Sequence, residues 1–201
     1  MCSSDLACAA PLRGKKGAHY EGGMRVPFIA AWAKPNAESP VQRRLPIAVG
    51  AVQRQQAAVY DIFPTLLALT GVENPPGHVV DGQRLDTLLA GKPDPDRGER
   101  FLMHYPHTHR SDYFTVWRDG DWKVIYHYFP TQVSGGSHYQ LYNLREDPFE
   151  QRDLAADDPA TLRRMMQGLV ATCESQGALY PVDPTTRSEE HTSELQSRVD
   201  I

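Results

Sequence analysis

A lysine and an arginine, Lys16 and Arg25, lie in a stretch near the start of the chain where glycine recurs. The glycines are Gly14, Gly17, Gly22 and Gly23. Glycine lets the backbone turn tightly and come close to a ligand, and a lysine ammonium beside such a turn can bind an anion. A solvated basic loop has the same composition. The residues alone therefore leave two interpretations open, an anion site or a solvated loop.

A second candidate is a run of histidines between two expected strands. Its potential ligand-binding residues are His104, His107, His109 and Arg110. Histidines this close can hold zinc, but the run has no cysteine and no histidine pair at the i, i+4 spacing of a helix, so we predict no metal site here. Imidazole and guanidinium groups can also contact sugar hydroxyls or anions. We therefore consider a substrate-contacting loop, beside the simpler interpretation of polar residues on an exposed loop.

The elements that follow the glycine-rich stretch are short. Val26 to Trp32 is an apolar run between prolines, which predicts a buried strand. Asp61 precedes a pattern with apolar residues on one helical face, and its side chain is expected to cap a helix that ends at Gly71. A second short helical face follows, formed by Leu85, Leu88 and Leu89.

Beyond a segment rich in proline and charge at 92–99, the pattern changes to strands. Apolar and β-branched runs predict strands at 101–105, 113–117, 122–128 and 140–144. The turn with Asp119 and Gly120 predicts a hairpin between the second and third of these. Residues 160–176 follow Asp158 and Pro159 with apolar side chains at helical spacing, which predicts a final helix. The sum is a mixed α and β chain with a small antiparallel sheet.

Composition excludes some function classes. The 201 residues carry a net charge of −4 and no basic run, so nucleic acid is not an expected partner. No apolar stretch is long enough to span a bilayer. Of the three cysteines, Cys8 and Cys173 could form one pair, which does not assign a redox compartment.

The two ends of the chain have an unusual relation to each other. Read back through the genetic code, Cys2–Leu6 and Arg187–Thr192 can be encoded by reverse-complementary strings. Ligated sequencing adapters produce such ends, so we expect residues 1–6 and 187–201 to be adapter-like and outside the fold. The alternative is a natural, polar, disordered tail.

Several motifs resemble those of sulfatases, the arylsulfatase-like members of the alkaline phosphatase superfamily. Lys16-Gly17, with Tyr20-Glu21-Gly22-Gly23 and Arg25-Val26-Pro27, closely resembles their segment G-K-G-x-x-Y-E-G-G-x-R-x-P. Later segments resemble D-x-x-P-T-L, D-G-x-x-L…L-x-G, G-D-W-K-L-I and L-Y-D-L-x-x-D-P-x-E, in the order of the family. They begin at Asp61, Asp81, Gly120 and Leu141. Each motif alone is weakly specific, whereas the ordered set is far more specific.

The resemblance implies an α/β fold of the alkaline-phosphatase type. Residues 7–95 would be the C-terminal part of the catalytic domain. Residues 96–186 would be a small α+β subdomain with an antiparallel sheet and a C-terminal helix.

The resemblance also implies hydrolysis of a sulfate ester. Sulfatases use a formylglycine made from Cys or Ser in a C-x-P-x-R motif, near a calcium ion (Ca2+) bound by Asp and Asn. Lys16 matches the family lysine that contacts the sulfate, although Lys15 replaces the glycine expected before it. Glu21 and Arg25 are expected to pair with backbone or with each other.

The chain departs from the family pattern in one important respect. It has no C-x-P-x-R, and Cys8–Arg13 is a near miss with proline and arginine each one place late. We therefore expect the nucleophile and most calcium ligands to belong to a longer parent protein, and this chain alone to be inactive. The expected substrate is a small-molecule or carbohydrate sulfate ester, and the parent is expected to be periplasmic or secreted. The alternatives are a phosphodiesterase or phosphonate hydrolase of the same superfamily, or a non-catalytic carbohydrate- or protein-binding module.

Overall fold

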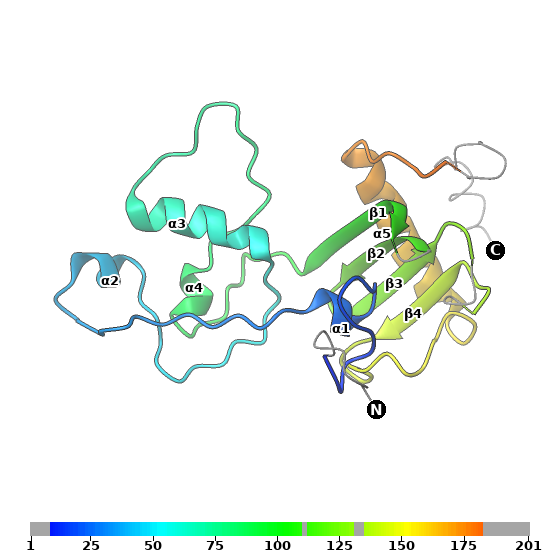
Figure 1. Ribbon diagram of the computed structural model, residues 1–201, viewed down its shortest axis with the longest axis horizontal. Helices are drawn as coiled ribbons and strands as arrows, with labels where there is room; N and C mark the ends of the chain where they lie inside the picture. Colours follow the sequence, from blue (N-terminus) through cyan, green and yellow to red (C-terminus); the bar gives the residue numbers. More distant parts are fainter. Residues whose placement is uncertain (1–8, 110–111, 131–134, 183–201) are drawn as a thin grey trace. The chain divides into compact units, whose positions relative to one another are not determined.

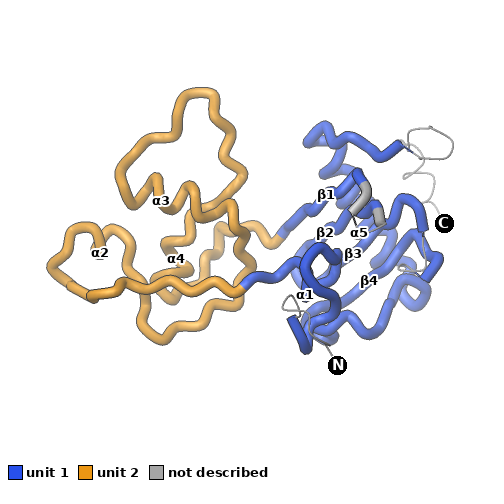
Figure 2. Tube along the Cα trace, in the orientation of Figure 1, with its two compact units in different colours: residues 1–26, 100–201 blue, residues 27–99 orange. Residues whose placement is uncertain are grey.

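The computed structural model describes residues 9–109, 112–130 and 135–182, without the side chains at 108, 109 and 112. The described chain forms two compact units (Figure 2). Unit 1 combines residues up to 26 with those from 100 onward, and unit 2 is residues 27–99. The second junction lies near the boundary expected at 95. Residues 9–26, however, pack with the sheet of unit 1, so the boundaries of the domains in a parent protein stay a prediction.

Unit 1 is built on a four-stranded antiparallel meander in the order β1-β2-β3-β4 (Figure 1). The strands are β1 Arg100–His109, β2 Asp112–Asp119, β3 Trp122–His127 and β4 Tyr139–Asn143. Gly120 has a φ of 59° in the turn between β2 and β3, a conformation that glycine adopts without strain. The four predicted strands and the predicted hairpin are confirmed.

Strand β1 is longer than predicted. The sequence indicates an end near residue 105, but pairing with β2 is irregular only between Tyr105 and His109 and resumes at His109 opposite Asp112. Pro106 lies in the irregular part, where a residue without a backbone N–H disrupts the ladder least. His104 falls within the strand predicted at 101–105, whereas the prediction that His107 lies on a loop is wrong, because it also belongs to β1.

Helix α5, Pro159–Ser175, covers one face of the sheet (Figure 1). It begins as predicted, because the Asp158 side chain accepts a hydrogen bond from the Thr161 N–H at 3.0 Å. Its buried apolar stripe packs on the sheet side chains of one face. The two sets are Met165, Met166, Leu169, Val170 and Cys173 from the helix, and Trp117, Val124, Tyr126, Tyr128 and Leu141 from the sheet side.

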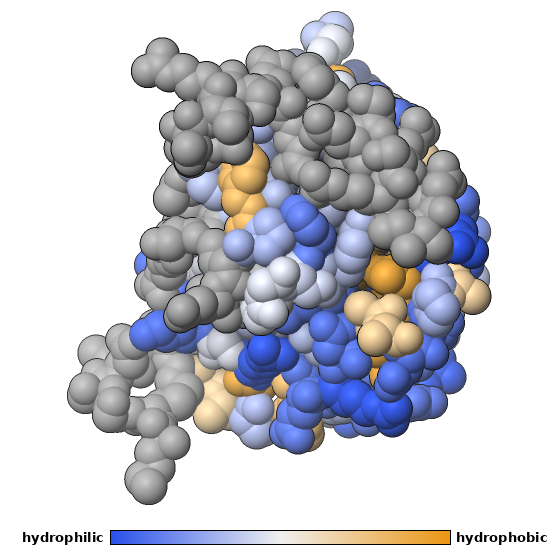
Figure 3. All heavy atoms as spheres, turned by 90° about the vertical axis from the view of Figure 1, so that its right-hand side faces the viewer, coloured by the Kyte–Doolittle hydropathy of each residue, from blue (hydrophilic) through white to orange (hydrophobic). Residues whose placement is uncertain are grey.

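The opposite face of the sheet is covered by residues 9–26, which include the short helix α1, Glu21–Met24. Tyr20 joins a second core with side chains of β2, β3 and β4 and with Leu144; the sheet members are Phe114, Val116, Ile125 and Tyr142. Strand β3 is consequently buried on both faces. In the view of Figure 3, the described residues are mostly hydrophilic, with isolated apolar residues among them.

Unit 2 contains short helices joined by long irregular segments. They are α2 Pro40–Arg44, the 3-10 turn η1 Val59–Asp61, α3 Ile62–Thr70 and α4 Asp86–Leu89. Helix α3 ends at Gly71 with a φ of 71°, as predicted. The buried apolar residues of this unit are few, namely Leu45, Leu85 and Leu88. Among the helices that the structure describes, none is long and apolar enough to cross a membrane.

Two predictions for this part of the chain are wrong. Val26 to Trp32 forms no strand, and Ile29 is 91% exposed. A strand needs a hydrogen-bonded neighbour, and no described segment pairs with this run. Asp61 does not cap α3. Its carboxylate accepts the Ala58 and Gln83 N–H groups and forms a buried ion pair at 2.7 Å with Arg97.

Candidate functional site

The segment that carries Lys16 folds back on itself. The Gly22 N–H donates to the Arg13 carbonyl at 2.8 Å, and the Ala18 N–H donates to the Lys15 carbonyl at 2.8 Å. A Cβ at Gly22 would lie 2.5 Å from the Arg13 carbonyl oxygen, and one at Gly23 would lie 2.2 Å from that of Ala18. Both glycines are therefore required by the close approach of two backbone segments. We call residues 13–25 the lysine loop.

Arg13 and Tyr20 attach the lysine loop to the sheet side of unit 1. The Arg13 guanidinium lies 3.8 Å from the centroid of the Tyr20 ring, as in a cation–π contact. Its Nη1 donates to the Glu150 carbonyl at 2.7 Å and to the Tyr142 hydroxyl at 3.0 Å. The Tyr20 hydroxyl donates to Gln140 Oε1 on β4 at 3.0 Å.

A buried charge cluster joins the base of the lysine loop to the sheet side of unit 1, and it consists of Glu21, Lys123 and Glu150. The Lys123 Nζ lies 3.0 Å from Glu21 Oε1 and 2.7 Å from Glu150 Oε1. The Glu21 backbone N–H donates to Glu150 Oε2 at 2.6 Å. Arg25 pairs with the other side of the Glu21 carboxylate, which confirms the expected Glu21–Arg25 pairing. Lys123 and Glu150 have no exposed side-chain surface, so the cluster is shielded from water.

The two carboxylates of the cluster have opposite electrostatic environments. Burial outweighs the attraction of Lys123 and raises the pKa of Glu150 above its ordinary value of 4.5. Burial also acts to raise the pKa of Glu21, but Lys123 and then Arg25 overcome it and lower that pKa below 4.5. One ammonium serves two carboxylates. Glu150 is therefore the carboxylate that takes up a proton first on acidification.

Lys16 itself is exposed, in a turn followed by Gly17 with a φ of 84°. The contacts that hold the lysine loop come from Arg13, Tyr20, Glu21 and Gly22, at its base. Lys16 thus lies at the solvent side of a loop whose base is fixed, where its ammonium is accessible to an anion. Its catalytic role stays a prediction.

The histidines divide between the two faces of the sheet. The His104 Nε2 lies 2.7 Å from the Leu179 carbonyl, and its Nδ1 lies 2.7 Å from Thr115 Oγ1. A carbonyl can only accept, so Nε2 carries the proton. Burial is the main cause that lowers the pKa of His104, which favours this neutral form. Both ring nitrogens thus have intramolecular partners on the face covered by α5.

His107 is exposed and lies on the opposite face. Its ring is 4.2 Å from that of Tyr105, which stacks on Phe114 in the core beneath residues 9–26. Of the two predicted substrate-binding histidines with a described side chain, His107 lies on the face of the lysine loop and His104 does not. The His109 side chain and Arg110 lie outside the described residues, so their predicted contacts stay predictions.

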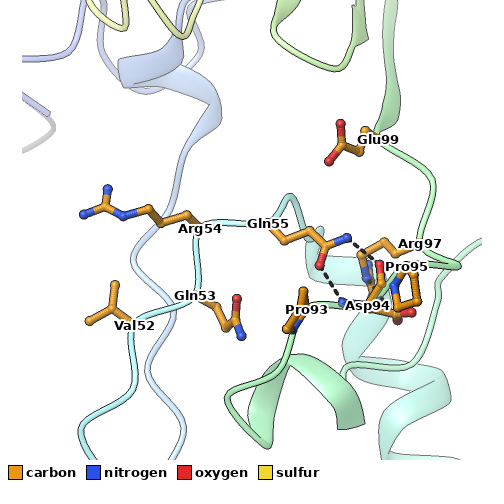
Figure 4. Close-up of a pocket in the computed structure, with 9 residues that line it drawn as sticks. All are labelled: Val52, Gln53, Arg54, Gln55, Pro93, Asp94, Pro95, Arg97 and Glu99. Atoms are coloured by element: carbon orange, nitrogen blue, oxygen red, sulfur yellow. Dashed lines mark hydrogen bonds and ion pairs between the residues drawn. The ribbon is translucent and has the colours of Figure 1, made fainter.

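Unit 2 contains an open depression of about 690 Å³ (Figure 4). Its wall is held by Gln55, whose amide donates to the Asp94 carbonyl at 2.7 Å and accepts the Asp94 N–H at 2.8 Å. Arg54 and Glu99 also line it (Figure 4). No predicted site residue lines this depression, and we assign it no role. Nowhere in the described part of the chain do three or more His, Cys, Asp or Glu side chains form a group that could hold a metal ion.

Comparison with known proteins identifies the family. Residues 15–175 match the family described as N-sulphoglucosamine sulphohydrolase, C-terminal. The chain belongs to this sulfatase family. The match includes residues 15–25 of the lysine loop, the whole sheet and α5.

Individual relatives agree with this membership. The sulfatase chain is 30% identical to steryl-sulfatase of Mus musculus over 202 residues, covering 89% of this chain and 30% of that protein. It is 28% identical to arylsulfatase D of Homo sapiens over 191 residues, covering 84% and 30%. The chain thus spans about 30% of the length of these curated relatives.

Solved structures support the α/β sulfatase fold class. A sulfatase of Bacteroides thetaiotaomicron, from work on its metabolism of multiple glycosaminoglycans, is 26% identical with a TM-score of 0.54, covering 80% of this chain and 32% of its own. The crystal structure of Ps i-CgsB, at 23% identity, has a TM-score of 0.59 and covers 95% of this chain and 37% of its own, which shows the likeness of fold.

Lys123 and Glu150 form contacts that the motifs alone do not reveal. Both residues fall within segments that resemble the family motifs. Those segments predict a strand and a turn, and they do not indicate that the two side chains meet. The available signal is that Lys123 stands between Trp122 and Val124 in an apolar run. A lysine on a strand buried on both faces requires a carboxylate partner, and the sequence does not indicate which one.

Proposed function

We propose that this chain is part of a sulfatase that hydrolyses sulfate esters, and that Lys16 is its contact to the sulfate group. The observation that carries the proposal is the exposed Lys16 on a loop whose base is fixed to the sheet. The names of the relatives favour a sulfatase over a phosphodiesterase or phosphonate hydrolase of the same superfamily.

The chemistry of sulfuryl transfer explains what Lys16 would do. The transferred group carries negative charge, and charge also develops on the leaving oxygen, so catalysis depends on positioning and charge stabilisation. The Lys16 ammonium would donate hydrogen bonds to sulfate oxygens and offset this charge. It acts best from a fixed loop, because a flexible one loses conformational entropy when the anion binds.

The nucleophile and the metal are proposed for the parent protein by family membership. A formylglycine would supply the attacking oxygen, and Ca2+ would stabilise negative charge. The residues of this chain do not fit either group, because the sequence has no C-x-P-x-R and the described residues form no metal-binding group. The part proposed for this chain is therefore confined to binding the anion and stabilising its charge.

A carbohydrate sulfate ester is the substrate class that we propose. The family description and the glycosaminoglycan context of the Bacteroides thetaiotaomicron sulfatase support it. The exposed imidazole of His107, on the face of the lysine loop, could hydrogen-bond a sugar hydroxyl. By the same reasoning from the family, we propose a periplasmic or secreted parent.

Titration of the isotope-labelled chain with inorganic sulfate, followed by NMR, tests the role of Lys16. Sulfate is expected to shift the amide signals of residues 15–18 in the wild-type chain. The Lys16→Ala variant should lose at least about half of this shift, because a single ammonium supplies most of the local positive charge. Lys15→Ala is the matched control and should keep the larger part of it.

Activity provides a second arm of the same test. The purified chain should not hydrolyse a chromogenic aryl sulfate in the presence of Ca2+ above the level of Lys16→Ala. Turnover above that level would overturn the proposal that the nucleophile and the metal ligands belong to the parent protein and not to this chain. Equal loss of the sulfate shift in Lys15→Ala and Lys16→Ala would reject Lys16 as the specific contact.

A further inference from the structure

We infer that Lys123 and Glu150 are positioning residues, which fix the lysine loop on the sheet through the buried charge cluster. Lys123 lies in strand β3 and Glu150 lies after strand β4. The sulfatase-like motifs that contain these residues do not connect them with the sulfate site proposed at Lys16. The consequence for sulfate binding rests on the proposed function of Lys16, whereas the anchoring of the loop does not.

The first argument is that Glu150 holds the lysine loop at two points. Its carbonyl accepts the Arg13 guanidinium at 2.7 Å, and its Oε2 accepts the Glu21 backbone N–H at 2.6 Å. Glu150 is also the one non-glycine residue with a positive φ, 54°, among the described residues. This backbone conformation is uncommon for an L residue, and it persists where surrounding contacts determine it. The contacts to Arg13 and Glu21 are such determinants.

The second argument concerns the energetics of Lys123. A fully buried ion pair adds little net stability compared with apolar side chains of similar volume, because both charges lose their hydration. The position of Lys123 is nevertheless specific, because its ammonium donates a hydrogen bond to Glu21 Oε1 at 3.0 Å and lies 2.7 Å from Glu150 Oε1 as an ion pair. Lys123 reaches Glu21 in α1 and Glu150 after β4 with the same ammonium, so it joins three segments that are remote in sequence. Such an arrangement fixes the position of the lysine loop on the sheet more than it adds to the free energy of unfolding.

The third argument is the distribution of contacts along the loop. Arg13, Tyr20, Glu21 and Gly22 all bond at the base, and the nearby Lys16 is exposed. The base, which the buried charge cluster fixes, therefore limits where the backbone of Lys16 can lie. Loss of the cluster should loosen the loop before it unfolds the sheet.

Amide hydrogen exchange measured by NMR on the full chain tests this inference. In Lys123→Met and in the milder Glu150→Gln, exchange of the Gly22 and Gly23 amides should accelerate by about tenfold or more, the effect of losing one charge-assisted hydrogen bond. Exchange at Val116 and Leu169, in the two cores, should change much less. Sulfate should then shift the residue 15–18 amides less than in the wild-type chain.

Thr115→Val is the matched control. Thr115 is as buried as Lys123, and its hydroxyl bonds His104 and Tyr128 on the other face of the sheet. This variant should accelerate exchange in the α5 core without a selective effect on Gly22 and Gly23.

The outcomes separate the two proposals. Equal acceleration at all sites, or no acceleration at Gly22 and Gly23, would overturn the positioning role of Lys123 and Glu150. Selective loosening of the loop in a chain whose Lys16 region never responds to sulfate would support the positioning role and reject the proposed function of Lys16.

Discussion

Glu21 and Glu150 share the Lys123 ammonium, but folding shifts their pKa values in opposite directions. The pKa of Glu150 is raised in the folded chain, so the folded state binds this proton more tightly than the unfolded state. The pKa of Glu21 is lowered, so the unfolded state binds that proton more tightly. The two residues therefore have opposite effects on the pH dependence of stability.

This opposition predicts the pH dependence of unit 1. As pH falls from neutral toward the ordinary glutamate value of 4.5, protonation of Glu150 should raise its contribution to the free energy of unfolding. Below pH 4.5, protonation of Glu21 should remove the stabilising contribution of its ion pairs. Urea denaturation at several pH values, for the wild-type chain and Glu150→Gln, checks this. The difference between them should change between neutral pH and 4.5, and a difference independent of pH would contradict the assignment.

At the scale of elements, the contact between α5 and β2 depends on a missing side chain. Gly168 stands in the middle of α5, where glycine is less favourable than alanine by about 1 kcal/mol. A Cβ at this position would lie 2.7 Å from the Nε1 of Trp117, which is buried in the core beneath the helix. Glycine at this position therefore lowers the helix propensity of α5 but allows the helix to pack closely on the sheet.

Gly168→Ala should accordingly destabilise unit 1 despite the gain in helix propensity. Overpacking a buried contact costs about 1–3 kcal/mol, which exceeds the propensity gain in most of that range. Gln167→Ala, at an exposed position on the same helix, should change stability by less than about 0.5 kcal/mol. Urea denaturation followed by circular dichroism measures both. A Gly168→Ala variant more stable than the wild-type chain would show that Trp117 moves aside freely.

The periodicity of apolar residues predicts those strands and helices whose pattern is complete within their own sequence. Strands β2 to β4, the β2–β3 hairpin and α5 were predictable because each has alternating or helical apolar spacing with its own turn or cap. Residues 26–32 have the composition of a strand but no partner among the described segments, and pairing is not encoded locally. The buried charge cluster was unpredictable for a similar reason. Lys123 and its carboxylate partners are more than 25 residues apart, so the fold alone reveals which groups meet.

The two units differ in how they bury apolar surface. Unit 1 has a core on each face of its sheet, whereas unit 2 has few buried apolar residues and is joined internally by the buried Asp61–Arg97 pair. Large apolar side chains of unit 2 are exposed, including Phe28 at 56% and Ile29 at 91%. Exposed apolar surface of this kind favours association between molecules. Unit 2 is thus expected to open more readily than unit 1 and to drive self-association.

Replacement of both exposed residues tests this expectation. Phe28→Ser/Ile29→Ser should reduce self-association of the chain, measured by sedimentation velocity over a range of concentrations, because it removes apolar area that association would bury. The urea transition of unit 1 should stay within about 0.5 kcal/mol of the wild-type value, since neither side chain belongs to its cores. Leu179→Ser is the control, because Leu179 is 80% exposed but belongs to unit 1. If Leu179→Ser lowers association as much as the double replacement, the association surface is not specific to unit 2.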